Sequence, residues 1–138
     1  MKLLNTIDPR LNHPGIWFGL GCLWIMIVCY LSLTSTPPAL PATDHSDKVA
    51  HALAYALLTL WWLQLYSRWA QRWIIIAGSV LLGTGIEVAQ SFHPLRYFDV
   101  WDMLANCVGV TLAILACLTP LSRLLIGTEA TLGLGQQA

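Results

Sequence analysis

Long apolar stretches separated by short polar ones dominate the chain from about residue 15 to residue 118. A helix that spans a membrane needs roughly 20 mostly apolar residues, because each residue adds about 1.5 Å against a hydrocarbon layer about 30 Å thick. Four segments meet this requirement. We therefore predict an all-α membrane protein, a bundle of four transmembrane helices over about 15–33, 46–66, 73–90 and 99–118.

The first apolar stretch has two interpretations. Lys2 and Arg10 precede it and the small residues Ala39 and Ala42 follow it, as in a secretory signal peptide. However, the apolar stretch is longer than is typical of a signal peptide, and the sequence Leu-Pro-Ala at 40–42 is a poor cleavage site. We expect a retained helix.

Lysine and arginine are distributed unevenly between the two sides of the predicted membrane. Five of the seven precede the first helix, separate the second from the third or follow the fourth: Lys2, Arg10, Arg68, Arg72 and Arg123. The other two, Lys48 and Arg96, lie on the opposite side. Short loops rich in Lys and Arg stay in the cytoplasm. We therefore expect a cytoplasmic N-terminus and a cytoplasmic C-terminus, with 124–138 as a flexible cytoplasmic tail.

The composition agrees with a bilayer environment. Hydrophobic residues make up 57% of the chain and charged residues only 10%, whereas a soluble domain has roughly a quarter charged residues. The net charge is zero and no basic patch is present, which excludes nucleic acid as a partner. The cysteines lie in apolar stretches and form no Cys-x-x-Cys motif, so we expect neither a zinc knuckle nor a redox pair.

Polar residues at helical spacing form one stripe on each of three predicted helices, near the outward side. Spacings of three or four residues place side chains on the same face of a helix. The stripes are Asp47, His51 and Tyr55, with Lys48 beside them; Glu87 and Gln90; and Asp102 and Asn106.

The rise per residue places the deeper members of these stripes at one level. Glu87 lies about 21 Å above Trp73, so it sits somewhat under 10 Å below the outer surface. His51 and Asn106 lie about 6 Å below the first residue of their stripes. We therefore predict an outward-opening polar pocket. Its floor is His51, Glu87 and Asn106, and its rim is Asp47, Lys48, Gln90, Arg96 and Asp102.

Structural roles compete with a functional one. Asp99 fits the N-cap of the fourth helix, with Asp102 at the third helical position as in a capping box, and we expect that role for Asp99. The remaining polar residues could bond the helices together. Such bonds contribute only about 1 kcal/mol in membrane bundles, and Ser, Thr or Asn would supply them without an ionisable group that costs on the order of 3 kcal/mol. We therefore favour a functional pocket.

The same residues resemble the VanZ-like family of small bacterial membrane proteins, named for a protein associated with resistance to the glycopeptide teicoplanin. The resemblance covers roughly half the chain, and the first helix matches only in being apolar. It implies a single VanZ-like membrane domain over 1–138, multi-pass in the bacterial cytoplasmic (inner) membrane, with an effect on susceptibility to cell-wall antibiotics. The matching motifs are Asp47-Lys48-x-x-His51-x-x-x-Tyr55, Gly83-x-x-x-Glu87-x-x-Gln90 and Arg96-x-x-Asp99-x-x-Asp102-x-x-x-Asn106-x-x-Gly109.

Our leading hypothesis is that the pocket binds, or chemically alters, an envelope lipid or cell-wall precursor that carries phosphate or polar head groups. Lys48 and Arg96 would hold the anion. His51 and Glu87 would supply acid and base functions, with Asp102 as a third catalytic candidate. In a variant, a divalent metal that activates water is bound by candidates Asp47, His51, Glu87 and Asp102. The further binding candidates are Tyr55, Gln90, Asp99 and Asn106.

Two other classes of function stay open. The pocket could bind a partner or an antibiotic without catalysis, or the chain could be a small proton-coupled exporter with one intramembrane carboxylate. The exporter ranks last, because the ionisable groups gather at one face and the sequence has no repeat. The sequence also lacks the acid phosphatase motifs and the His-Glu-x-x-His metalloprotease motif. The sequence establishes neither an enzymatic activity nor an oligomeric state.

Overall fold

The computed structural model describes residues 7–34, 46–92 and 98–134, and the secondary structure in these ranges is entirely helical. The all-α prediction is thus confirmed. The elements are α1 (Pro14–Leu33), α2 (Ser46–Leu65), α3 (Trp69–Ser91), α4 (Val100–Cys117), the 3-10 helix η2 (Pro120–Arg123) and α5 (Leu124–Thr131).

The four long helices occupy the four predicted segments. The largest difference is at α3, which begins at Trp69 rather than at 73. Its first turn contains Gln71 and Arg72, which do not contribute to an apolar pattern. The Arg72 guanidinium stacks over the Trp69 ring and its Nε donates to the carbonyl oxygen of Tyr66 at 2.8 Å. These contacts hold a turn that the apolar pattern does not reveal.

Among the described helices, α1, α3 and α4 are long and apolar enough to cross a membrane. Helix α2 has 20 residues as well, but Lys48, His51 and Gln64 make it more polar. Large apolar side chains are exposed on the outer helix faces, among them Ile74 (72% exposed) and Leu81 (70% exposed). Such faces indicate a lipid bilayer as the environment.

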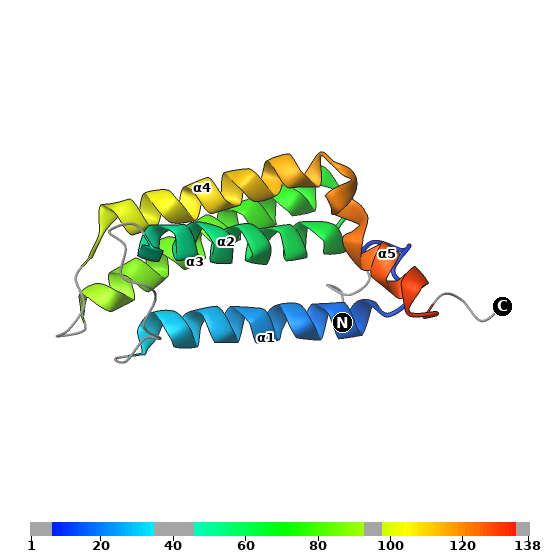
Figure 1. Ribbon diagram of the computed structural model, residues 1–138, viewed down its shortest axis with the longest axis horizontal. Coiled ribbons are helices and arrows are strands. Elements are labelled where there is room, and N and C mark those ends of the chain that lie inside the picture. Colours follow the sequence, from blue (N-terminus) through cyan, green and yellow to red (C-terminus); the bar gives the residue numbers. More distant parts are fainter. Residues whose placement is uncertain (1–6, 35–45, 93–97, 135–138) are drawn as a thin grey trace.

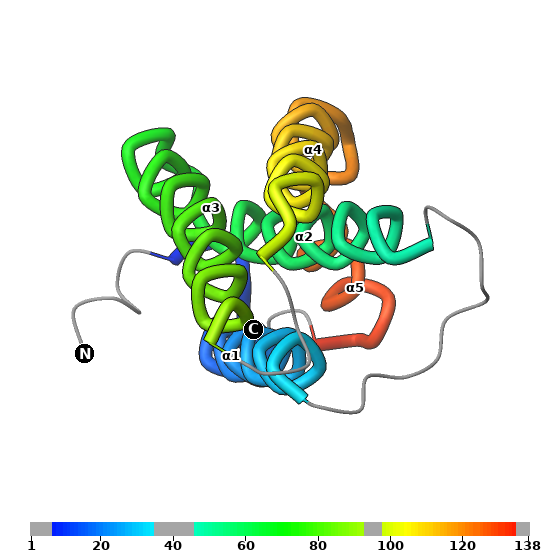
Figure 2. The backbone as a smooth tube through the Cα atoms, turned by 90° about the vertical axis from the view of Figure 1, so that its left-hand side faces the viewer, coloured from blue at the N-terminus to red at the C-terminus, as the bar shows by residue number. Residues whose placement is uncertain are grey.

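Successive long helices run in opposite directions (Figure 1). One end of the bundle, called the site end below, therefore carries the last turns of α1 and α3 and the first turns of α2 and α4. The other end, called the α5 end, carries the α2–α3 connection, η2 and α5. Helix α2 contacts α1, α3 and α4. The view from the site end shows that its axis is inclined to the axes of these three helices (Figure 2).

Helices α2 and α4 make the most extensive contact in the bundle. Gly109 allows this approach, because a Cβ atom at this position would overlap the backbone carbonyl oxygen of Ala52. Below the site end, Val28, Leu63, Ile76 and other buried apolar side chains fill the space between the helices. The polar stripes of α2 and α4 are therefore held at a fixed distance and register.

The segment after residue 123 differs from the predicted flexible tail, since residues 124–131 form helix α5. The Glu129 carboxylate on α5 is 1% exposed and ties this helix to the segment before α1. It accepts hydrogen bonds from the Asn12 amide N (2.7 Å) and Nδ2 (3.1 Å), the His13 amide N (2.9 Å) and Trp17 Nε1 (2.6 Å). No sequence pattern predicts this contact, because its partners lie more than 100 residues away.

Candidate functional site

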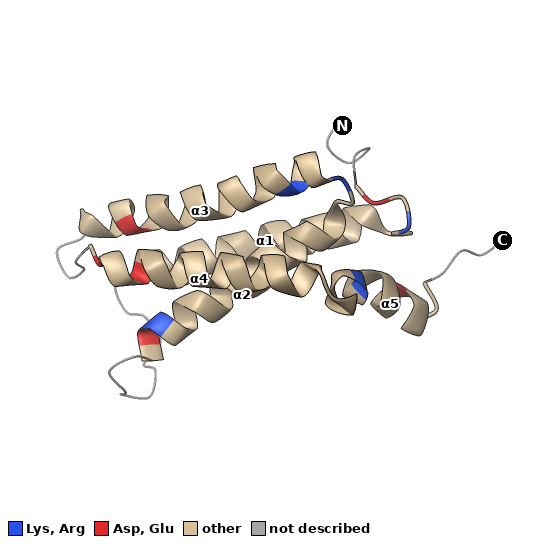
Figure 3. Ribbon diagram, turned by 90° about the horizontal axis from the view of Figure 1, so that it is seen from above, with Lys and Arg blue, Asp and Glu red and all other residues tan. Residues whose placement is uncertain are grey.

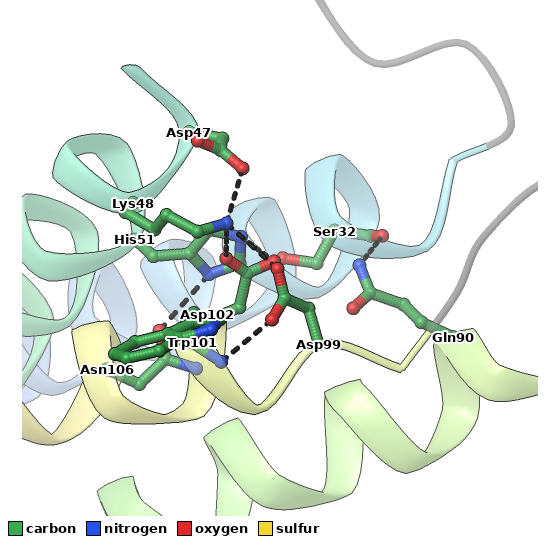
Figure 4. A network of polar contacts seen from close by, with 9 residues as sticks. All are labelled: Ser32, Asp47, Lys48, His51, Gln90, Asp99, Trp101, Asp102 and Asn106. Carbon is green, nitrogen blue, oxygen red and sulfur yellow. Dashed lines mark hydrogen bonds and ion pairs between the residues drawn. The ribbon is translucent and has the colours of Figure 1, made fainter. Parts of the chain in front are cut away.

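Lys48, in the first turn of α2, forms the centre of a charged network at the site end (Figure 4). Its Nζ donates to Asp47 Oδ2, Asp99 Oδ2 and Asp102 Oδ1, each at 2.9 Å. An ammonium group has three N–H donors. All three donors of Lys48 are thus used by carboxylates, and α2 is joined to the start of α4.

Asp99 caps α4, as predicted. It is the N-cap residue, and its Oδ1 accepts a hydrogen bond from the Trp101 amide at 2.8 Å. The hydrogen bond from Lys48, together with that from the Trp101 amide, lowers the pKa of Asp99 below its usual value. The Asp102 carboxylate points to α2, where it meets Lys48 and His51.

His51 lies one turn below Asp47 and connects α2 to α4 a second time. Its Nδ1 is 3.1 Å from Asn106 Oδ1. Because an amide oxygen only accepts hydrogen bonds, Nδ1 carries the proton in this contact. In the neutral ring the other nitrogen, Nε2, then carries the lone pair, and it lies 3.7 Å from Asp102 Oδ2.

Glu87 on α3 completes the group from the third helix. It is 0% exposed, and neither carboxylate oxygen has a hydrogen-bond partner among the described residues. One ligand atom each from His51, Glu87 and Asp102 lies within 4.8 Å of the others. The structure therefore brings the three predicted catalytic candidates together.

Exposure decreases from the tip of the site end towards Glu87. The side chain of Asp47 is 54% exposed, that of Lys48 28% and that of Asp102 17%. The gradient departs from the predicted rim and floor at two residues: the side chain of His51, predicted for the floor, is 20% exposed, and Gln90, predicted for the rim, is buried.

Gly83, one turn below Glu87, makes room for two of the other candidates. A Cβ atom at this position would lie 3.0 Å from Asn106 Nδ2 and 3.3 Å from the Tyr55 ring. Tyr55 is 2% exposed, and within the described part of the chain its hydroxyl has no hydrogen-bond partner. The motif glycine thus permits close packing beneath the charged group.

Two candidates are not placed in this group. Gln90 is buried, and its Nε2 donates to the carbonyl oxygen of Ser32 at 2.8 Å, which ties α3 to the end of α1. Arg96 lies outside the described residues. Ser32 was not among the predicted residues, because it contributes a backbone carbonyl, which no residue pattern reveals.

The contacts of Lys48 change the expected chemistry of the site. A phosphate could receive a hydrogen bond from Lys48 only by displacing one of its three carboxylates. Among the described residues, three carboxylates (Asp47, Asp99 and Asp102) surround this one lysine, and a fourth, that of Glu87, lies close to Asp102. The arrangement is thus better suited to a cation than to a bare anion.

Comparisons with known proteins place these residues in a wider context. The chain matches the VanZ/LLP1 family over residues 15–123, a range that includes all three motifs. An uncharacterised protein of the fission yeast Schizosaccharomyces pombe is 36% identical over 110 residues, which cover 78% of this chain and 67% of the relative. No solved structure matches the chain.

Proposed function

The chain belongs to the VanZ/LLP1 family, and we propose that its site end binds and alters the polar head group of a phosphate-bearing envelope lipid or cell-wall precursor. One observation carries this proposal: His51, Glu87 and Asp102 come from three helices to within 4.8 Å, and Glu87 is buried without a partner. An ionisable residue held in this way is costly in a membrane protein and marks a functional site.

The charge distribution supports an outward-facing site in a bundle of four spans, with α2 as the least apolar span. Charged residues lie towards the two ends of the long helices (Figure 3). Three arginines lie at the α5 end: Arg68 is the N-cap of α3, Arg72 is in the first turn of α3 and Arg123 is in η2. Because cationic residues favour the cytoplasm, the α5 end and both termini are cytoplasmic. In a bacterial cell the membrane is the inner membrane.

The position of the site favours a lipid as the ligand. His51 and Asn106 lie in the first two turns of their helices, near the level at which lipid head groups meet the hydrocarbon. The yeast relative favours a phosphate-bearing lipid, which every cell membrane supplies, over a precursor confined to bacteria. Altered teicoplanin susceptibility would follow indirectly, from a changed envelope lipid.

The alteration that these residue types suit is hydrolysis. A water molecule loses a proton to a base of the site and its oxygen bonds to the phosphorus. The bond between phosphorus and the lipid alcohol oxygen breaks, and the alcohol leaves with a proton. One water is consumed and no oxidant is needed, so His51, Glu87 and Asp102 only have to bind, orient and move protons.

Reconstitution tests the proposal. The full chain is placed in vesicles of phosphatidylglycerol, phosphatidylethanolamine and a polyprenyl diphosphate, and the extracted lipids are analysed by mass spectrometry. We expect the wild-type chain to convert one of these lipids to its alcohol, diacylglycerol or polyprenol, with release of the phosphate-bearing head group. His51→Gln and Glu87→Gln should lower the rate by at least about 100-fold, while size-exclusion profile and helix content stay unchanged.

Other outcomes would replace the proposal. Unchanged lipids, together with binding that survives both glutamine substitutions, would identify a non-catalytic interaction protein. Proton-coupled efflux from the vesicles would identify an exporter.

A further inference from the structure

We propose that His51, Glu87 and Asp102 bind a divalent transition-metal ion, and that this ion holds the phosphate of the ligand. The charge, burial and geometry of these side chains support the metal site independently of the proposed function. Its use in phosphate binding rests on the proposed function.

The charge around the site favours a cation. A phosphate that approached these side chains alone would meet Asp47, Asp99 and Asp102 around a single lysine whose donors are used. Like charges repel, so an anion is disfavoured there. A divalent cation beside Asp102 and Glu87 offsets the charge of these two carboxylates and offers a coordination position to a phosphate oxygen.

The carboxylate of Glu87 is buried, and both of its oxygens are unpartnered among the described residues. Buried polar groups are almost always paired with a donor, water or a metal ion. A metal ion beside His51 and Asp102 would satisfy Glu87 directly.

The orientation of the histidine suits a metal ligand. His51 Nδ1 lies 3.1 Å from Asn106 Oδ1, to which it donates, so that in the neutral ring Nε2 carries the lone pair. Histidine ligands of metals characteristically donate their second ring nitrogen to a carbonyl or carboxylate, which fixes the tautomer and the ring. Asn106 provides such a carbonyl, so we assign it a positioning role.

The distances fit a metal after a small closure. His51 Nε2 and Asp102 Oδ2 are 3.7 Å apart, outside hydrogen-bond range. Two ligand atoms at tetrahedral angles around zinc are about 3.4 Å apart, given bonds of about 2.1 Å. The three candidate atoms lie within 4.8 Å, so binding requires the side chains to move closer by little more than an ångström.

The ligand set indicates the class of metal. One imidazole nitrogen and two carboxylates suit Zn²⁺ or Mn²⁺ better than Mg²⁺ or Ca²⁺, which prefer oxygen ligands alone. Three protein ligands leave at least one coordination position for water or a phosphate oxygen, as in catalytic zinc sites.

Metal binding is tested with the purified full chain in detergent, with any polyhistidine tag removed and metals stripped by a chelator. The protein is dialysed against Zn²⁺ alone, and bound zinc is counted by elemental analysis. We expect one zinc per wild-type chain, with affinity at least tenfold weaker in His51→Gln and in Glu87→Gln. Asp8→Asn is the matched control, because it neutralises a buried carboxylate at the α5 end, and it should bind zinc like the wild type.

Two results would overturn the metal site. One is the absence of zinc from the wild-type chain. The other is equal zinc in the wild type and both glutamine variants, which would mean an adventitious ion only.

The vesicle assay, run with and without chelator, separates this inference from the proposed function. Zinc that depends on His51 and Glu87, without any change in the lipids, would leave the metal site standing and refute the proposed function. Lipid turnover that survives the chelator in a chain without zinc would refute the metal site and leave the proposed function standing.

Discussion

The Nδ1 atom of His51 on α2 lies 3.1 Å from Oδ1 of Asn106 on α4. This contact crosses the closest helix pair of the bundle, which Gly109 brings together. It therefore couples the ring orientation of the histidine to the packing of two helices. The relationship gives Asn106 a testable role that differs from general stabilisation.

Removal of the Asn106 acceptor should weaken the metal site. We expect Asn106→Ala to lower zinc affinity about 10- to 100-fold, because the ring and tautomer of His51 are no longer fixed. Asn106→Asp should keep most of the affinity, since a carboxylate oxygen accepts the same hydrogen bond. Titration with Zn²⁺ measures both. Equal zinc affinity in Asn106→Ala and the wild type would show that Asn106 does not position His51.

The α2–α4 contact should depend on Gly109. We expect Gly109→Ala to lower the free energy of unfolding by about 1–3 kcal/mol, because the added Cβ meets the backbone of Ala52, which cannot move aside alone. Gly78→Ala in α3 is the matched control. Nothing lies within 4 Å of a Cβ there, so a gain of up to about 1 kcal/mol is expected from helix propensity. Unfolding in detergent measures both changes, and similar effects at the two positions would speak against the close approach.

The residues of the Lys48 network should contribute unequally to the free energy of unfolding. We expect Lys48→Gln to lower the free energy of unfolding by about 1–2 kcal/mol, since three carboxylates then lie together without a cation. Asp47→Asn should change it by less than about 0.5 kcal/mol, because the Asp47 side chain is 54% exposed. Thermal unfolding of the two variants at low salt checks this order. A larger loss in Asp47→Asn would be inconsistent with the network described.

The docking of α5 should depend on pH through Glu129. Burial opposes ionisation of this carboxyl, but hydrogen bonds from Asn12, Trp17 and His13 outweigh it and lower its pKa below 4.5. A carboxyl with a lowered pKa stabilises the fold fully above its unfolded pKa, and loses this contribution as the pH falls through the folded value. We therefore expect α5 to loosen below about pH 4.5.

Hydrogen exchange of α5 amides between pH 6 and pH 3.5, corrected for intrinsic rates, measures this loosening. Glu129→Gln should exchange faster already at pH 6 and show little further pH dependence. The same pH response in wild type and Glu129→Gln would assign the effect to another group.

The sequence was sufficient to predict the four long helices and most members of the polar group, but not which of those members pair with one another. Apolar length placed α1 and α4 to within one residue, and spacings of three and four residues selected the stripes that meet around Glu87. The contacts of Lys48 depend on how α2 and α4 are rotated about their axes, which spacing along one helix does not set. The α5 helix was missed because one short helix carries no membrane-length signal.

The most direct test is the shift in unfolding temperature that Zn²⁺ causes in the wild type and in Glu87→Gln. If Glu87 is a ligand, the wild type should melt several degrees higher with saturating Zn²⁺ than with chelator. Glu87→Gln should lose this shift and, in chelator, melt at the wild-type temperature or above, because a buried carboxylate without a partner has been replaced by a neutral amide. A variant that melts well below the wild type in chelator, with no zinc shift in either protein, would show that Glu87 holds the helices together and would contradict the account.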